Sequence, residues 1–189
     1  MRMTRIEKRF VNEVGHSRRV AEETVWRLRH LPVQPSWSYL DVGCGNGAAA
    51  LLIADTFGMH VVGVDVDLQQ IALARSAPGD RTDVVFITAD ATRLPFDDER
   101  FEIVATNKMT HHVPQWPSAL AEMRRVLKRQ GYLIYADLKI PSWLAWILNP
   151  LAGHVGVFTR ADLDRGFASL QRVHRRTGWL HYEAILQKL

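Results

Sequence analysis

Tyr39-Leu40-Asp41-Val42-Gly43-Cys44-Gly45-Asn46-Gly47 is the stretch of sequence that decides the fold. It predicts a short strand that stops in a loop of three alternate glycines, and helix-forming residues follow from Ala48. Glycine permits positive φ angles and lets a ligand approach the main chain, so we expect a tight turn with an exposed backbone surface. The free N–H groups at the start of the following helix favour an anionic or polar ligand above this loop.

The spacing of these glycines disfavours two common nucleotide sites. The pattern GxGxG differs from the GxGxxG of a dinucleotide-binding fingerprint. No GK[ST] follows it, as a phosphate-binding loop would require. A dinucleotide and a nucleoside triphosphate are therefore both disfavoured as ligands of this loop.

Length and composition predict one globular domain over residues 1–189. The chain is 47% hydrophobic and 23% charged, which is typical of a folded protein with a substantial core. Its single cysteine, Cys44, excludes an internal disulfide and a cysteine-rich metal site. The first residues lead into charge rather than an apolar signal segment, so we expect a cytoplasmic protein. Cys44 has no histidine beside it in sequence, and its small size in a glycine turn explains it better than a nucleophilic role.

The net charge of +4 is concentrated at the two ends of the chain. Residues 1–30 carry eight Lys/Arg and four Asp/Glu (+4), residues 159–189 carry six and three (+3), and the middle carries ten and thirteen (−3). The basic residues are interleaved with acids and form no aromatic-basic recognition motif, which makes nucleic acid an unlikely partner. We expect a solvated basic surface, with a footprint for an acidic substrate as the alternative.

Strand and helix patterns alternate with short connections, which predicts an α/β domain with a mainly parallel sheet. Ser17 is expected to cap the first helix, Gly58 to end the second, and Asp67 to cap the third. A closing antiparallel hairpin is expected around Thr177-Gly178. The expected helices lie at 17–30, 47–57 and 68–76, from about 117 to 129, and at 160–169. The expected strands lie at 37–42, 59–65, 83–88, 101–106, 131–137, 171–176 and 179–187.

The segment 140–151 is apolar and aromatic but shorter than the roughly 20 residues that cross a bilayer. It is expected to serve as part of a substrate lid over 138–158 or as an interfacial patch in peripheral contact with a membrane. Trp143 and Trp146 are candidates for the wall of an apolar or aromatic substrate pocket. Core packing or a partner surface explains them equally well.

Acidic residues fall at the ends of the first three strands. Asp65 ends the second strand at the same edge as the glycine loop, where a carboxylate can accept two hydrogen bonds from a ribose diol. Asp67 is the better helix cap, which leaves Asp65 for a ligand. Asp90 ends the third strand and can accept from an exocyclic amine. Asp41 is expected to be buried, so the loop amides or a ligand ammonium group must satisfy its carboxylate.

Five motifs in order resemble those of class I S-adenosylmethionine-dependent methyltransferases. The similarity covers roughly residues 17–138 and is closest to the small-molecule branch that contains the ubiquinone and menaquinone C-methyltransferases. It implies a Rossmann-like fold with a seven-stranded, mainly parallel sheet, helices on both faces and a C-terminal antiparallel hairpin. The motifs are YLDVGCGNG (39–47), GVDVD (63–67), DATRLPF (90–96), FEIVATNKMTHHV (101–113) and LAEMRRVLKRQGY (120–132).

The resemblance implies a binding residue for each part of S-adenosylmethionine, with S-adenosylhomocysteine as product. The glycine loop corresponds to the site of the methionine portion, Asp65 to the ribose-binding acid, and Asn107 to a residue beside the methionine and the transferable methyl. The implied cofactor residues are Asp41, Gly43, Cys44, Gly45 and Gly47 for methionine, Asp65 for ribose, Val66, Asp90 and Ala91 for adenine, and Asn107.

The chain also departs from the patterns of some relatives. Lys128-Arg129-Gln130-Gly131 replaces a frequent KPGG, which alters a turn and removes no cofactor contact. Thr106-Asn107-Lys108-Met109 replaces the amide-methylating NPP[YF], so base amines and glutamine amides are disfavoured as substrates. No acidic cluster indicates a catalytic metal.

The implied reaction is an in-line displacement on a methyl group that the sulfonium already activates. It requires an aligned acceptor and exclusion of water, and it requires no protein nucleophile. An acceptor hydroxyl or acidic carbon is helped by a general base, for which His111 and His112 are candidates that the sequence does not distinguish. Packing and hydrogen bonding explain this histidine pair as well.

Three other functions remain open at the level of sequence. The chain is alternatively a cofactor-binding regulator or partner subunit without chemistry. A nicotinamide-dependent oxidoreductase is a weaker alternative because the chain lacks GxGxxG. An RNA methyltransferase is also a weaker alternative because only the basic ends of the chain suggest it. The identity of the methyl acceptor does not follow from these motifs.

Overall fold

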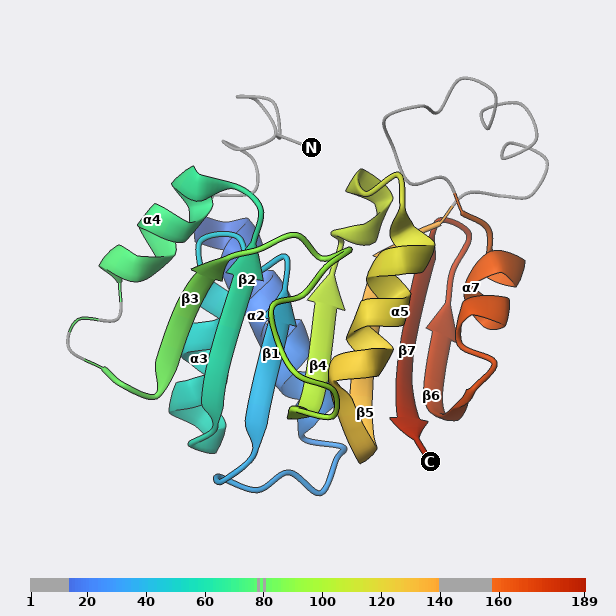
Figure 1. Cartoon of the computed structure of the whole chain (residues 1–189), viewed down its shortest axis with the longest axis horizontal. Coiled ribbons are helices and arrows are strands. Elements are labelled where there is room, and N and C mark those ends of the chain that lie inside the picture. The colour runs from blue at the N-terminus through green and yellow to red at the C-terminus, as the bar shows by residue number, and fades with distance from the viewer. Residues whose placement is uncertain (1–13, 78, 80, 140–157) are drawn as a thin grey trace. The chain divides into compact units, whose positions relative to one another are not determined.

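The computed structural model describes residues 14–77, 79, 81–139 and 158–189 (Figure 1). It divides into two compact units, an N-terminal unit over residues 2–91 and a C-terminal unit over residues 92–189, and each is described by itself. The apolar segment 140–151, with Trp143 and Trp146, lies outside the described residues, as does most of the expected lid. The single-domain organisation stays a prediction.

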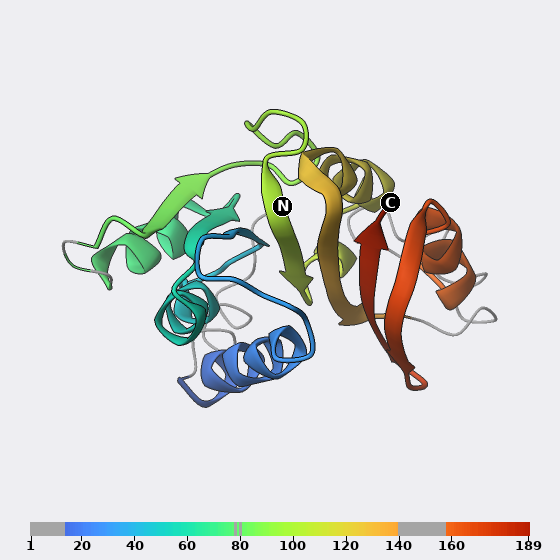
Figure 2. The same cartoon turned by 90° about the horizontal axis from the view of Figure 1, so that it is seen from below.

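The N-terminal unit is a three-stranded parallel sheet with helices on one face (Figure 2). Its strand order is β3-β2-β1, with Asp41 of β1 opposite Gly63 of β2, and Asp65 of β2 opposite Thr88 of β3. Because the strands are parallel, their carboxyl ends meet at one edge. The elements are α2 (Val14–Leu28), β1 (Ser38–Val42), α3 (Ala48–Phe57), β2 (His60–Asp65), α4 (Leu68–Ser76) and β3 (Val84–Thr88).

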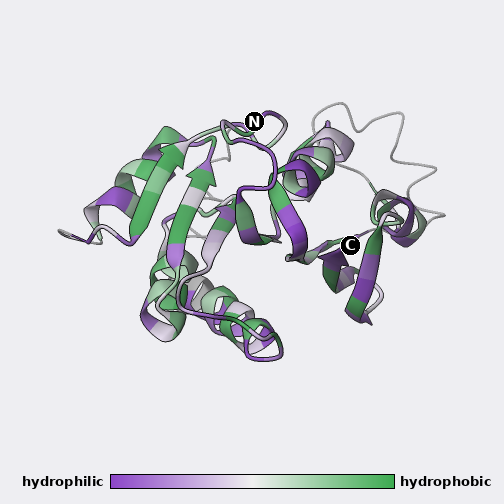
Figure 3. Cartoon of the chain, turned by 60° about the horizontal axis from the view of Figure 1, so that its bottom comes forward, coloured by the Kyte–Doolittle hydropathy of each residue, from purple (hydrophilic) through white to green (hydrophobic). Residues whose placement is uncertain are grey.

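The core of this unit forms around residues of β1 and the ring of Phe86. Tyr39, Leu40 and Val42 are fully buried, and the apolar character of β2 and β3 is visible in Figure 3. A Cβ atom at Gly47 would lie 2.5 Å from the Phe86 ring, and one at Gly63 would lie 2.6 Å from it. These two glycines therefore provide the space that Phe86 fills.

The C-terminal unit is a four-stranded mixed sheet in the order β4-β5-β7-β6. β4 and β5 are parallel, and β7 is antiparallel to both of its neighbours, so β6 runs in the direction of β5. Helix α5 packs on β4 and β5. The elements are β4 (Phe101–Asn107), the 3-10 turn η1 (Thr110–His112), α5 (Trp116–Val126), β5 (Leu127–Leu138), α7 (Arg160–Gly166), β6 (Leu170–Thr177) and β7 (His181–Lys188).

The predicted fold class is confirmed. The seven strands are mainly parallel, and the chain closes with an antiparallel hairpin whose turn follows Thr177. Two of the expected helix signals are also confirmed. Gly58 ends α3 with φ of 65°, and the Asp67 carboxylate accepts from the Gln69 amide at the start of α4.

Four expected boundaries are wrong, including the start of β5, which is at Leu127 instead of 131. α2 is already helical at Val14, so Ser17 lies inside the helix and does not cap it. The helix α5 ends at Val126, which places Lys128 and Arg129 in β5 rather than in the expected helix. α7 ends at Gly166, before the predicted 169.

The early start of β5 has a local cause. Gln130 adopts a positive φ of 63°, and the register between β4 and β5 shifts between Phe101 and Ile103. A Cβ atom at Gly131 would lie 2.7 Å from the Glu102 carbonyl oxygen, so the backbones approach closely here. The expected turn at Gln130-Gly131 is therefore a bulge within a continuous strand.

Candidate cofactor and catalytic site

The glycine loop has the tight, left-handed backbone that its sequence predicts. Gly43, Gly45 and Gly47 have φ angles of 79°, 54° and 79°. The Gly43 and Cys44 amides donate to the Val64 carbonyl oxygen at 2.8 and 3.0 Å, which ties the loop to the end of β2. The Cys44 side chain is buried, and burial raises the pKa of its thiol, so a nucleophilic thiolate is disfavoured.

Asp65 joins the glycine loop to the start of α4. One carboxylate oxygen, Oδ2, accepts from the Gly45 amide at 3.0 Å, and the other, Oδ1, accepts from the Asp67 amide at 2.9 Å. Burial raises the pKa of Asp65, and these two hydrogen bonds partly oppose that shift. The cap of α4 is Asp67, as expected. Each Asp65 oxygen keeps acceptor capacity for a ligand hydroxyl.

Asp41 is a buried carboxylate beside the same loop. Burial and the nearby charge of Asp65 raise the pKa of Asp41 to about 7. The loop amides that were expected to satisfy it donate elsewhere, those of Gly43 and Cys44 to Val64. Among residues 14–139 and 158–189, as far as they are described, no group donates a hydrogen bond to the Asp41 carboxylate. A ligand ammonium group remains as its natural partner.

The other residues predicted at the adenine end lie on the adjacent strand ends of this unit. Val66 follows β2 and is half exposed, while Asp90 and Ala91 follow β3. The Ala89 amide donates to the Asp65 carbonyl oxygen at 3.0 Å, which connects the two strand ends. The structure therefore brings the glycine loop, Asp65 and these residues to one sheet edge. Asn107 ends β4 and belongs to the C-terminal unit.

Gln70 was missed by sequence reasoning. It is fully buried on α4, and its amide nitrogen and oxygen have no hydrogen-bond partner among the described residues. Its Oε1 lies 3.8 Å from where a Gly45 Cβ would be. The available signal was a polar residue on the buried face of a helix, beside Ile71 and Ala74.

His111 is held by a buried carboxylate. Its Nδ1 lies 2.5 Å from Oδ1 of Asp137, which is the penultimate residue of β5 and is fully buried. The other Asp137 oxygen accepts from the Thr110 amide at 2.7 Å and from the Thr110 hydroxyl, which lies 2.6 Å from the Tyr135 hydroxyl. Burial raises the pKa of Tyr135, so its phenol stays protonated.

This arrangement distinguishes the two candidate histidines. A carboxylate at Nδ1 holds a proton on that nitrogen, so Nε2 of the neutral His111 ring carries the lone pair. The His112 ring packs against that of His111 at 3.9 Å between centroids, with the two ring planes tilted by 42°. Sequence reasoning missed Asp137 as a site residue, although it ends the fifth predicted strand just as Asp65 ends the second.

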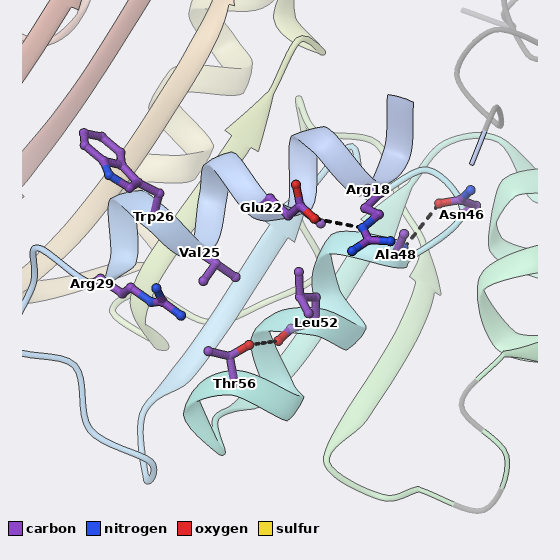
Figure 4. A pocket seen from close by; sticks show the side chains of 10 residues that line it. Arg18, Glu22, Val25, Trp26, Arg29, Asn46, Ala48, Leu52 and Thr56 are labelled. Carbon is purple, nitrogen blue, oxygen red and sulfur yellow. Dashed lines mark hydrogen bonds and ion pairs between the residues drawn. The ribbon is translucent and has the colours of Figure 1, made fainter. Parts of the chain in front are cut away.

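A separate groove of about 780 Å³ runs between α2 and α3 in the N-terminal unit (Figure 4). Val25 and Leu52 contribute apolar walls, and Arg18 pairs with Glu22 at 2.8 Å along one side. It reaches the glycine loop only at Asn46, whose Oδ1 accepts from the Ala48 amide. The groove lies between helices, whereas the predicted cofactor residues lie at strand ends.

No group of three or more His, Cys, Asp or Glu side chains among the described residues is arranged to hold a metal ion. No helix within the same residues is long and apolar enough to span a membrane.

Comparison with known proteins decides the family. Residues 40–135, which contain the glycine loop, Asp65, Asp90 and His111, match the model of a methyltransferase domain. The chain belongs to this methyltransferase family. The resemblance to class I S-adenosylmethionine-dependent methyltransferases of the small-molecule branch is thereby confirmed.

Relatives of known name are considerably longer. The chain is 37% identical over 159 residues to the phthiotriol/phenolphthiotriol dimycocerosates methyltransferase of Mycobacterium leprae, covering 78% of this chain and 57% of that one. It is 35% identical over 116 residues to the 27-O-demethylrifamycin SV methyltransferase of Amycolatopsis mediterranei, covering 59% and 43%. The chain thus spans about half the length of these relatives.

Solved structures support the fold. The geranyl diphosphate C-methyltransferase of Streptomyces coelicolor superposes with a TM-score of 0.73 over 94% of this chain and 84% of its own, at 17% identity. At this identity the likeness concerns the fold alone.

Proposed function

We propose that this chain transfers the methyl group of S-adenosylmethionine to a small-molecule acceptor. The observation that carries the proposal is the glycine loop, with three left-handed glycines at the carboxyl edge of a parallel sheet and the Asp65 carboxylate accepting from the Gly45 amide. Membership of the methyltransferase family supports it. A regulator that binds the cofactor without chemistry is the alternative.

The described residues fit the cofactor. The Asp41 carboxylate, which accepts no hydrogen bond from the described residues, suits the methionine ammonium group, and Asp65 suits the ribose hydroxyls. Gly43, Cys44, Gly45 and Gly47 would contact the methionine portion through their backbone. Val66, Asp90 and Ala91 would bound the adenine, and Asn107 would lie beside the methionine. When bound, the cofactor supplies a methyl group on a sulfonium, which an acceptor displaces in line.

His111 is the general base in this proposal. Its Nε2 takes the proton from an acceptor hydroxyl or acidic carbon, and Nδ1 keeps its own proton toward Asp137. The Asp137 carboxylate then faces a positively charged ring, which it stabilises. His112, packed against the ring of His111, helps to fix its orientation.

The acceptor is proposed as a small organic molecule because the relatives above are named for such compounds. Trp143 and Trp146 keep their proposed role as walls of an apolar or aromatic pocket. Neither an RNA acceptor nor NAD-dependent oxidation gains support from the described site.

Two measurements test the proposal. Calorimetric titration with S-adenosylhomocysteine should show binding that Asp65→Ala weakens by at least about tenfold while circular dichroism stays unchanged. Incubation with methyl-labelled cofactor and a metabolite extract should then label a product. Cofactor binding without any labelled product would favour the alternative of an inactive regulator. Binding of NAD in place of S-adenosylhomocysteine would contradict the proposal that S-adenosylmethionine is the cofactor.

A further inference from the structure

The turn between β6 and β7 exposes an apolar cluster that we call the hairpin tip, formed by Leu138, Trp179 and Leu180. Trp179 is 74% exposed, Leu180 48% and Leu138 45%. Lys139 joins them, since its amide donates to the Leu180 carbonyl at 3.0 Å and its Nζ donates to the Trp179 carbonyl at 2.8 Å. A tryptophan so exposed on a tight turn contributes little to the core, which indicates a contact outside the molecule.

The strand that leads into this turn is strongly basic. β6 carries Arg172, His174, Arg175 and Arg176, and residues 159–189 hold six Lys/Arg against three Asp/Glu. Arg172 and Arg175 share the Asp164 carboxylate at 3.1 and 3.5 Å, and Arg160 lies 3.3 Å from the same group. One carboxylate therefore faces three guanidinium groups, which leaves a positive excess along β6, the strand that leads into the hairpin tip.

The hairpin tip lies at the same edge of the sheet as the candidate base. β6 runs in the direction of β5, so its carboxyl end and the following turn meet the carboxyl end of β5 (Figure 1). Leu138 follows Asp137 directly and lies opposite His181 in the strand register. The apolar cluster thus begins one residue after the carboxylate that holds His111.

We propose that the hairpin tip docks this protein on an anionic lipid bilayer. Trp179, Leu180 and Leu138 enter the interfacial region, where an indole ring and leucine side chains are favoured. Lys139 and the arginines of β6 face the anionic headgroups. Docking rests on these exposed residues alone. Its consequence, that the edge with His111 faces an apolar acceptor at the bilayer, rests on the proposed methyl transfer.

Vesicle binding tests the docking directly. The full chain should sediment with vesicles of phosphatidylcholine and phosphatidylglycerol, less with phosphatidylcholine alone, and less again as salt is raised. The double variant Trp179→Ser/Leu180→Ser should bind the anionic vesicles at least about tenfold more weakly, because both apolar side chains lose their burial. The matched control is Trp26→Ser, which removes a half-exposed tryptophan from α2 and should bind as the parent does.

Fluorescence locates the contact. Brominated phospholipids should quench the tryptophan emission of the parent and of the Trp26→Phe variant. They should quench the emission of the Trp179→Phe variant much less, because this variant lacks the tryptophan that contacts the bilayer. Equal vesicle affinity of the double variant and the parent would overturn the proposal. So would tight binding to RNA or to an acidic polypeptide without any to the vesicles. None of these assays uses the cofactor, so a failure of docking and a failure of methyl transfer are separable.

Discussion

Nδ1 of His111 lies 2.5 Å from Oδ1 of Asp137, where His111 belongs to the turn η1 that follows β4 and Asp137 is near the end of the adjacent parallel strand β5. Asp137 also accepts from the amides of Thr110 and Leu138, so its carboxylate is fixed before any substrate arrives. The pair has the geometry of an oriented base, with Nε2 left to meet an acceptor. Two residues that are separated by 26 positions in sequence thus form one chemical unit.

Removal of the His111 ring should abolish most turnover. We expect His111→Ala to lower kcat by about 10²–10⁴-fold, the usual contribution of a general base, while affinity for S-adenosylhomocysteine is kept. His112→Ala should cost far less, because it removes a ring that packs against His111 and leaves the His111–Asp137 pair in place. Steady-state kinetics with the acceptor identified by methyl labelling measures kcat, and calorimetry measures the affinity for S-adenosylhomocysteine. Full turnover by His111→Ala would show that His111 is not the general base.

Asp137→Asn tests the positioning role of Asp137. The amide keeps the size of the carboxylate but removes the charge that stabilises a protonated His111 ring. We expect kcat to fall with KM for the acceptor and cofactor affinity nearly unchanged. The double variant His111→Ala/Asp137→Asn should be no slower than His111→Ala alone, because Asp137 acts through the histidine. Strictly additive losses would contradict this.

The buried Asp41 carboxylate predicts a pH-dependent stability. Its pKa is raised from 3.8 to about 7, so the folded state favours the protonated carboxyl. The contribution of Asp41 to the free energy of unfolding is therefore fully present below about pH 4 and is lost as pH rises through 7. The Asp41→Asn side chain stays neutral at every pH. At pH 8 the free energy of unfolding of this variant should therefore exceed that of the parent, by roughly 4 kcal/mol at most. The difference should vanish near pH 4. Urea unfolding of both proteins across this range measures it.

The same group predicts the opposite trend for cofactor binding. An ionised Asp41 attracts a ligand ammonium, so affinity for S-adenosylhomocysteine should rise as pH increases through about 7. Asp41→Asn should bind more weakly at pH 8 and lack this rise. Calorimetric titration at several pH values checks both statements, and an unchanged slope in the variant would assign the pH dependence to another group.

Gly47 should tolerate no side chain. A Cβ at this position would lie 2.5 Å from the Phe86 ring, and the left-handed backbone of Gly47 is one that an L-residue rarely adopts. Gly47→Ala should therefore destabilise the protein by about 2–4 kcal/mol. Gly79→Ala is the matched control, because Gly79 has a similar φ of 63° and nothing within 4 Å of its Cβ position. Its loss should be about 1 kcal/mol. Equal thermal shifts in both variants would show that the contact with Phe86 is unimportant.

Several features of this protein followed from its sequence alone, because they depend on local backbone requirements. Left-handed turns need glycine, a helix start favours Asp67, and the carboxyl ends of parallel strands share an edge. The glycine loop, Asp65 and Asp90 were therefore predictable as one group of residues. The strand order within each unit follows the same logic of alternating strands and helices.

Only the tertiary structure decided the features that depend on side chains distant in sequence. Neighbouring histidines look alike in a sequence, and the pairing of β4 with β5 places Asp137 against His111 rather than His112. The bulge at Gln130 and the exposure of Trp179 likewise depend on which strands lie side by side. The sequence thus predicted which residues form the proposed methyl-donor site, and the packing of strands decided which histidine pairs with Asp137.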